Sequence, residues 1–239
     1  MNNPLIYTDP SGEWFIIEDW IIGGIRGLFN GKGFIKGANE QAMNAIKIWG
    51  GLFKTDSNED FKNRSWQLIS RFTWEVPQTV IGLFYSLTRN TFGCVDRVDY
   101  FGGATFATNE GSKRNNGLAL GNYININNKE ADRISGSFTD YLLSNPKYMH
   151  EYGHYIDSQI YGLSYLFVVG VPSLFSAAFD DDVPIYMWKG SFVYNPHNLY
   201  KHDVRKYEMR ANKRAAGYFK KYYGVDWSIF RKYPTFNPF

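Results

Sequence analysis

The spacing of hydrophobic residues changes twice along this chain of 239 residues. From Trp14 to Arg97, apolar positions recur mostly at helical spacing. Between Tyr100 and Asn128 the pattern shifts to short runs rich in β-branched and aromatic residues, with a turn cluster (EGSKRNNG) at 110–117, which is typical of an antiparallel hairpin. Helical spacing returns at 138–161 and at about 201–223. The pattern predicts an α+β fold that is mostly helical, with a small antiparallel sheet before the helix at 138–161.

Capping residues divide the first helical region into separate helices. Residues 14–29 form the first apolar stretch, and the glycine-rich segment 30–37 (NGKGFIKG) follows as a linker, because it lacks the Lys-Ser ending of a phosphate-binding loop. Asn39 is placed to cap a second helix, and Ser57 or Asn58 a third.

Residues 158–179 (SQIYGLSYLFVVGVPSLFSAAF) contain no charged side chain, and their number is about what spans a bilayer. Gly162, Gly170 and Pro172 interrupt the run, and serine, glutamine and tyrosine make it more polar. We therefore favour a pair of buried core helices, broken near Gly170 and Pro172, over a hairpin that contacts a membrane.

Composition narrows the class of protein. With 44% hydrophobic and 21% charged residues the chain is globular and can bury a sizeable core. A net charge of +3 is too small to predict a nucleic-acid partner. Cys94 is the single cysteine, which excludes an internal disulfide. The first residues lack a basic segment followed by an apolar core, so we expect no signal peptide in this chain.

The segment HEYGH at 150–154 carries the clearest chemistry in the chain. On a helix, His150 and His154 lie about 40° apart on one face, so both imidazoles can bind one ion. Glu151 lies about 100° further round, where it can reach a water on that ion without binding the metal. Zn²⁺ suits imidazole ligands, and a catalytic zinc takes three protein ligands and leaves a position for water. The alternative is a solvent-facing helix with two incidental histidines.

The third zinc ligand must come from elsewhere, and downstream candidates are His197, His202, Asp203 and Glu208. Glu208 begins a helical pattern (EMRANKRAAGYF) with alanines where helices can pack closely, and Asn212, four residues later, is placed to orient a liganding histidine. We favour Glu208 over His202. The alternative for Glu208 is a surface carboxylate paired with a nearby basic residue.

This arrangement resembles the gluzincin metallopeptidases, which carry HExxH on one helix and a glutamate ligand on a second. The resemblance implies zinc held by His150, His154 and Glu208, and peptide-bond hydrolysis with Glu151 as the general base. Tyr207, His197 and His202 are candidates for stabilising the oxyanion. Residues 117–126 are the candidate strand edge for an extended protein or peptide substrate.

A longer stretch, 100–219, resembles a metallopeptidase-like domain found at the ends of Rhs-type proteins. Strand segments with GG and LGNYI precede the HEYGH helix in it, the apolar run 158–179 follows, and a helix matching Glu208, Ala211, Asn212, Ala215, Tyr218 and Phe219 closes it. The opening segment 3–13 (NPLIYTDPSGE) also resembles the end of the Rhs core, after which a variable effector domain follows.

These resemblances imply three parts: the tail of an Rhs core at 1–13, a helical region at 14–99 and a zincin-like catalytic region at 100–239. They further imply a toxic effector that is secreted or delivered into a target cell within a larger protein, and a cognate immunity protein as partner. Two alternatives remain: a toxin that inserts residues 158–179 into a membrane, and a non-catalytic module in which the metal is structural.

Overall fold

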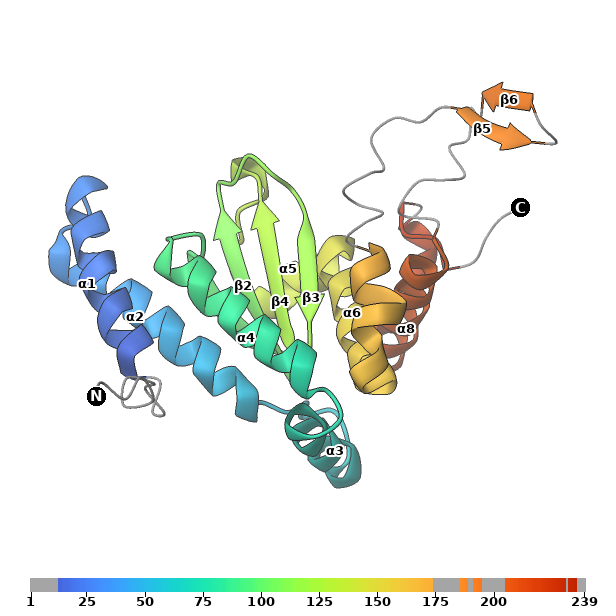
Figure 1. Ribbon diagram of the computed structural model, residues 1–239, viewed down its shortest axis with the longest axis horizontal. Helices are drawn as coiled ribbons and strands as arrows, with labels where there is room; N and C mark the ends of the chain where they lie inside the picture. The colour runs from blue at the N-terminus through green and yellow to red at the C-terminus, as the bar shows by residue number, and fades with distance from the viewer. Residues whose placement is uncertain (1–12, 174–184, 189–190, 195–204, 231, 236–239) are drawn as a thin grey trace, which may run out of the picture.

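A computed structural model of the protein describes residues 13–173, 185–188, 191–194, 205–230 and 232–235, and it confirms a mixed α and β architecture (Figure 1). The helices are α1 (Glu13–Phe29), α2 (Phe34–Gly50), α3 (Phe61–Phe72), α4 (Val76–Thr91), α5 (Phe138–Ser144), α6 (Pro146–Tyr161) and α8 (Lys206–Tyr223). The strands are β1 (Arg97–Phe101), β2 (Ala104–Glu110), β3 (Gly117–Leu120), β4 (Tyr123–Asn128), β5 (Ile185–Trp188) and β6 (Ser191–Tyr194).

The sheet between α4 and α6 has the order β1-β2-β4-β3 and is mixed, so the prediction of a purely antiparallel sheet is wrong. Strands β1 and β2 pair antiparallel, and so do β3 and β4, but β2 pairs parallel to β4. The turn cluster after β2 carries the chain past the neighbouring position to the edge, and the turn at Gly121 (φ 59°) brings β4 back between β2 and β3. Local turn residues therefore predicted a reversal of the chain but not which strands become neighbours.

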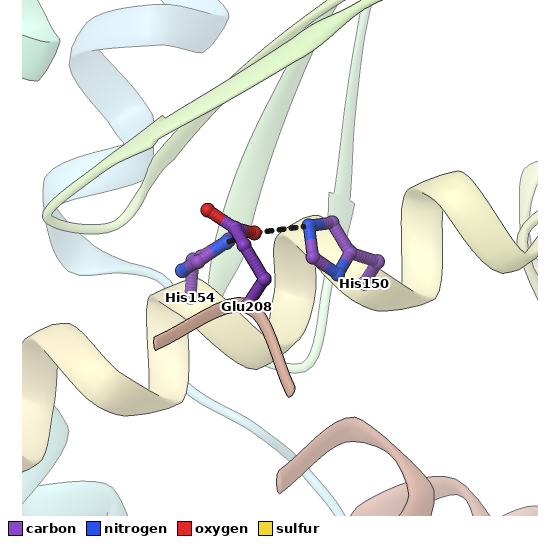
Figure 2. A group of neighbouring side chains, drawn as sticks. All are labelled: His150, His154 and Glu208. Carbon is purple, nitrogen blue, oxygen red and sulfur yellow. Dashed lines mark hydrogen bonds and ion pairs between the residues drawn. The ribbon is translucent and has the colours of Figure 1, made fainter. Parts of the chain in front are cut away.

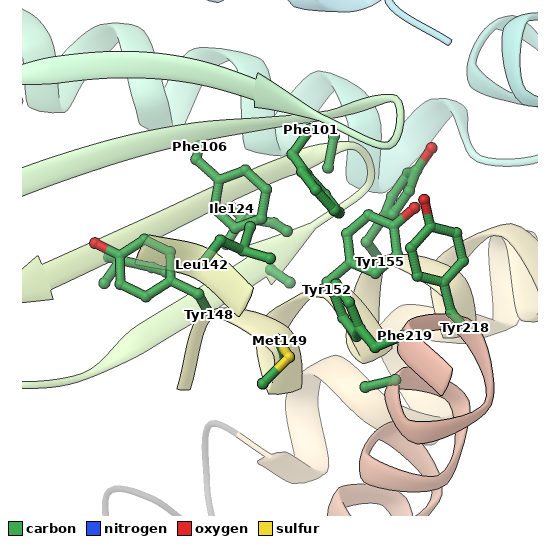
Figure 3. Packing of buried hydrophobic residues seen from close by; sticks show 14 of the residues in the cluster. Phe101, Phe106, Ile124, Leu142, Tyr148, Met149, Tyr152, Tyr155, Tyr218 and Phe219 are labelled. Atoms are coloured by element: carbon green, nitrogen blue, oxygen red, sulfur yellow. The ribbon is translucent and has the colours of Figure 1, made fainter. Parts of the chain in front are cut away.

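Helices cover both faces of this sheet, because its strands alternate apolar side chains between two clusters. One cluster lies under α2 and α4, where Ile48 and Leu87 pack against Val98 and Tyr123 of the sheet. The other lies under α5, α6 and α8 (Figure 3), and its central members are Phe101, Phe106, Ile124, Leu142, Tyr148, Met149, Tyr152, Tyr155, Tyr218 and Phe219. Residues 14–99 and 100–239 thus share a core through α2, α4 and the sheet.

The predicted single helix at 138–161 is two helices. Helix α5 ends at Ser144, and Asn145 then begins α6 with its side chain accepting a hydrogen bond from the backbone N–H of Lys147. Pro146 occupies the first turn, where its missing N–H costs nothing. Gly162 ends α6 with a φ of 51°, a value that favours glycine. The break places the histidine segment in the middle of a well-capped helix.

The sequence predicted that the apolar run beginning at Ser158 breaks near Gly170 and Pro172. In the structure it breaks at Gly162 instead. A 3-10 turn spans Gly162–Ser164, and the backbone is helical again from Tyr165 to Ser173, including a π-helical turn at Leu166–Gly170. Tyr165 and Val169 are buried, whereas Phe167 and three neighbouring apolar side chains are exposed. Residues 174–179 lie outside the described part of the chain.

Within the residues that the structure describes, none of the helices combines the length and the apolar character that crossing a membrane requires.

The N-terminal helices also start at other residues than the capping pattern predicted. Helix α2 begins at Phe34, so Asn39 lies inside it and caps nothing. Helix α3 begins after Asp60, whose carboxylate accepts a hydrogen bond from the N–H of Asn63, and not after Ser57 or Asn58. Several Asn, Asp and Ser residues precede α3, and the tertiary position of the helix decides which of them becomes the cap.

Candidate metal centre

Helix α6 presents His150 and His154 on the face that meets α8, while Tyr148, Met149 and Tyr152 on its other faces pack in the core. The two imidazoles are four residues apart, and their ring centroids are separated by 4.8 Å. Their side chains are almost buried, with exposed fractions of 12% for His150 and 6% for His154. The helix is not solvent-facing at this point, which excludes two incidental surface histidines.

Glu208, in the first turn of α8, completes the cluster (Figure 2). Its Oε2 lies 3.1 Å from Nε2 of His150 and 2.9 Å from Nε2 of His154, and its side chain is 1% exposed. The alternative of a surface carboxylate is therefore wrong. Among the described residues, these three form the one group of three or more His, Cys, Asp or Glu side chains whose ligand atoms all lie close enough, within 4.8 Å, to hold one ion.

The approach of α8 to α6 depends on small residues and one buried ion-pair cluster. A side chain at Gly153 would collide with the backbone carbonyl of Ala211 on α8. One turn further along α6, Asp157 is fully buried and accepts from Arg210 at 3.2 Å and Arg214 at 3.5 Å. Glycine at 153 therefore lets the two helices of the site pack closely.

Asn212 fixes the orientation of His150. The Oδ1 of Asn212 lies 2.7 Å from Nδ1 of His150, and its amide nitrogen donates to the carbonyl of Pro234 at 2.8 Å. Since the amide nitrogen is used on Pro234, Oδ1 must accept from His150, and Nδ1 therefore carries a proton. This leaves Nε2 as the atom available to a metal, and it is the Nε2 atom that faces Glu208.

Ser173 holds the other oxygen of the glutamate, since its hydroxyl donates to Glu208 Oε1 at 2.7 Å. Tyr207, the neighbour of Glu208, donates its hydroxyl to the carbonyl of Pro172 at 3.1 Å. The segment after α6 and the first turn of α8 are thus joined beside the ligand cluster. The other two oxyanion candidates, His197 and His202, and the alternative ligand Asp203 lie outside the described residues.

The charges at this site call for a cation between the imidazoles and the carboxylate. Burial acts to lower the pKa of His150, but the hydrogen bond to Glu208 and the charges of Glu151 and Glu208 outweigh it and raise the pKa to about 9. Burial acts to raise the pKa of Glu208, but the charge of His154 and hydrogen bonds from both imidazoles hold it well below its usual range. An imidazole without a proton on Nε2 would direct a lone pair at the carboxylate, so a proton or a metal ion must lie between each Nε2 atom and Glu208.

The donor set suits zinc in its chemistry, and its two contacts to Glu208 are close to the spacing of zinc ligands. Two imidazole nitrogens and one carboxylate oxygen are the ligands of many catalytic zinc sites. Ligands about 2.05 Å from a tetrahedral ion lie about 3.3 Å from one another. The two contacts to Glu208 Oε2, at 3.1 and 2.9 Å, need to lengthen by only about 0.2–0.4 Å to admit it.

Glu151 stays apart from this three-residue cluster and lies against the sheet. Its side chain is largely buried, and a side chain on Gly117 would collide with its carboxyl group. Gly117 begins β3, the edge strand. Strand β4 pairs on both sides, so the predicted edge at 117–126 is confined to residues 117–120. The carboxyl group of Glu151 thus lies where α6 meets the edge strand β3.

No protein-family model matches this chain, and a search of curated proteins and of solved structures likewise finds no match. The resemblances noted in the sequence therefore remain expectations, and the geometry of the cluster supplies the argument for function.

The sequence did not single out Ser173 or Tyr233, and the ring centroid of Tyr233 lies 5.4 Å from that of His150. Ser173 is one of several serines in an apolar run, and Tyr233 lies in the C-terminal segment beyond the last predicted helix. No local pattern distinguishes them. Their contacts with Glu208 of α8 and His150 of α6 give them a place at the site.

Proposed function

We propose that this chain is a zinc-dependent peptide hydrolase, with the ion held by His150, His154 and Glu208. The observation that supports this proposal is the separation of two roles in one buried place. Two Nε2 atoms and one carboxylate oxygen converge within ligand distance of one ion, while Glu151, next to the first histidine, is kept out of the cluster and beside β3. A structural metal needs only the first feature.

Bound zinc would polarise the scissile carbonyl group and lower the pKa of a water molecule. Glu151 would accept the proton of that water and deliver it to the leaving amine. Asn212 would keep the Nε2 of His150 aimed at the ion, and Ser173 would hold Glu208 in one orientation. Tyr207, His197 and His202 remain the candidates for binding the oxyanion.

The edge strand β3 gives a peptide a place to bind. The backbone N–H of Asn127 donates to the carbonyl of Asn116, just before β3. Residues of an antiparallel pair bond to the partner strand at every second position, so residues 117 and 119 direct their N–H and C=O groups away from β4. The carbonyl of Ala119 already accepts a hydrogen bond from Tyr165 at 3.0 Å, which leaves the end at Gly117 for a substrate strand. That end is also the one that contacts Glu151.

Exchange of Glu151 for glutamine tests the proposal. Glu151→Gln keeps the size of the side chain and removes the base, so zinc content should stay at one per chain while peptide hydrolysis falls by about 10²–10⁴-fold. Glu40→Gln on α2, remote from the cluster, is the matched control and should keep full activity. Undiminished hydrolysis by Glu151→Gln would remove Glu151 from the mechanism.

The likeness to Rhs-type proteins extends this proposal to a biological role. We expect the chain to act as the toxic effector of a larger secreted protein, and a cognate immunity protein to neutralise it. Expression of the wild-type chain in a bacterial cell should arrest growth, and Glu151→Gln should not. Equal toxicity of the two would separate toxicity from hydrolysis.

One observation favours the competing hypothesis of a membrane-active toxin. In the helical segment after Gly162, Phe167 is 77% exposed, and Leu163, Val168 and Val171 are 43–51% exposed. Leakage of lipid vesicles caused by the Glu151→Gln protein would support that hypothesis, because hydrolysis is then removed. An intact vesicle population under the same conditions would leave peptide hydrolysis as the function.

A further inference from the structure

A polar pocket of about 390 Å³ opens beside the candidate metal centre, at the N-terminal end of α6. Asn115, which precedes β3, lies on one wall, Lys147 of α6 on another, and Phe230, Lys232 and Tyr233 of the C-terminal segment on a third. Two residues of the pocket lie close to the candidate zinc ligand His150. Lys147 precedes His150 by about one helical turn, and the ring of Tyr233 contacts the ring of His150.

Lys147 is a cation without a close counter-ion. Its Nζ donates to Asn115 Oδ1 at 2.5 Å, to the carbonyl of Asn127 at 3.0 Å and to Asn128 Oδ1 at 2.7 Å, all of them neutral acceptors. None of the ion pairs formed among the described residues includes it. It also lies in the first turn of α6, where the helix dipole disfavours a positive charge. Lys147 is half-buried, and a charge withdrawn from water is ordinarily paired with an opposite one.

The electrostatics of the pocket favour an anion. Burial lowers the pKa of Lys147 to about 8, and the nearby charge of Lys232 acts in the same direction against the carboxylates of Asp132 and Glu151. Two lysines and one aspartate, Asp132, line the pocket, so its walls carry a net positive charge. A carboxylate bound there would stabilise the ammonium form of Lys147.

One of the three hydrogen bonds of Lys147 can be exchanged for a ligand. The two acceptors at 127 and 128 belong to the end of β4, and Asn128 is fully buried. Asn115 is exposed and precedes the edge strand. A carboxylate that displaced the Asn115 amide would form a charge-assisted bond, which is stronger than the bond to a neutral amide.

We propose that this pocket binds an acidic side chain of the peptide substrate, next to the scissile bond, through Lys147 and Lys232. The inference rests on the proposed peptide hydrolysis and names its specificity. A peptide that pairs antiparallel with β3 runs from the Leu120 end towards Asn115. The side chain that enters the pocket then belongs to the residue following the scissile bond, so this residue is glutamate or aspartate.

Binding to the inactive Glu151→Gln chain tests the pocket without requiring catalysis. The probes are acetyl-Ala-Ala-Glu-Ala-Ala-amide and the same peptide with glutamine, which differ only in charge. The glutamate peptide should bind roughly fivefold to tenfold more tightly. Lys147→Met should abolish this preference and Lys147→Arg should keep most of it. Lys36→Met, on the distant helix α2, is the matched control.

Lys232→Ala provides a second measure that does not depend on the folding of a Lys147 variant, because Lys232 is exposed. It should reduce the preference for the glutamate peptide and leave the melting temperature unchanged. Equal affinity of the two peptides for the unaltered pocket overturns the inference. A third probe, acetyl-Ala-Ala-Gln with a free C-terminal carboxylate, distinguishes the sources of the anion. If it binds better than the internal glutamate, the pocket takes the end of a peptide and the side-chain assignment is wrong.

Cleavage by the wild-type chain separates this inference from the proposed function. Cleavage before glutamate at a rate well above cleavage before glutamine supports both. Cleavage without that preference overturns the pocket assignment and leaves peptide hydrolysis standing. If neither peptide is cleaved but the glutamate peptide is bound preferentially, the proposed function fails while the acid-binding pocket stands.

Discussion

Buried carboxylates in the N-terminal helices and at the candidate metal centre have different partners. Asp19 on α1 accepts hydrogen bonds from the amides of Gln41 and Asn90, and Glu75, which precedes α4, accepts from the hydroxyls of Ser70 and Ser158. Burial raises the pKa of both carboxyls, despite these bonds. Glu208 is equally buried, but its partners include two imidazoles, and its pKa is held low.

The hydrogen-bond partners of a buried carboxyl group thus distinguish a structural role, as for Asp19 and Glu75, from a role in binding a cation, as for Glu208. Amide and hydroxyl donors satisfy a carboxyl group in the core, and they leave it free to become neutral. Two imidazoles aimed at one oxygen keep the carboxylate ionised and bring further donor atoms to the same point. The comparison therefore predicts that a metal is bound at Glu208 and not at Asp19 or Glu75.

Removal of both histidines is expected to have the largest effect on this contrast. The His150→Ala, His154→Ala double variant should contain no zinc, because Glu208 alone cannot hold the ion, whereas Asp19→Asn should keep one zinc per chain. Metal analysis of the purified proteins measures both. Full zinc occupancy in the double variant would place the metal elsewhere.

Substitution of Glu208 should weaken zinc binding more than substitution of Asn212. Glu208→Ala removes a ligand and should lose most of the zinc on dialysis against a mild chelator, while Asn212→Ala, which only frees the orientation of His150, should weaken affinity by about 10–100-fold. His202→Ala should leave the metal in place. If His202→Ala strips the zinc and Glu208→Ala does not, the ligand set is three histidines and the assignment of Glu208 is wrong.

Alanine substitutions at Gly153 and Gly217 test whether close packing of α6 on α8 supports the metal centre. Gly153→Ala introduces a methyl group against the carbonyl of Ala211, so it should separate α6 from α8, destabilise the fold by about 1–3 kcal/mol and weaken zinc binding. Gly217→Ala on α8 meets open space and should stabilise by about 0.5–1 kcal/mol, through helix propensity alone. Chemical denaturation of the metal-free proteins gives both values, and equal effects would remove the close approach at Gly153 as a determinant of the site.

The smallest effect is expected on the outer face of α1. Ile21, Ile25 and Leu28 are 46–61% exposed there, whereas Ile124 under α6 is fully buried. Ile25→Ala should change the free energy of unfolding by less than about 0.5 kcal/mol, while Ile124→Ala should cost about 2–5 kcal/mol. A large loss from Ile25→Ala in the isolated chain would mean that this face is covered in solution.

More of the candidate site than of the supporting sheet could be predicted from the sequence. His150, Glu151 and His154 are within five residues on one helix, so their relative positions follow from helical geometry. Asn212 follows Glu208 by one turn for the same reason. Strand pairing has no such local rule. Strand β2 pairs with β4 although β3 lies between them in the sequence, and the turn residues are compatible with either neighbour.

By itself, the sequence determined the helical character of the chain, the α+β class, and the presence of a two-histidine segment with an adjacent glutamate. Each of these follows from spacing within a few residues, where backbone geometry leaves little choice. The tertiary structure alone decided how closely α8 brings Glu208 to His154, 54 residues earlier in the chain, at a distance set by Gly153 and Ala211. It also decided that β3 lies at the edge, with Gly117 against Glu151, and that Ser173 and Tyr233 join the site. These are contacts between segments distant in the chain, and they depend on how the whole core packs, which no local pattern encodes.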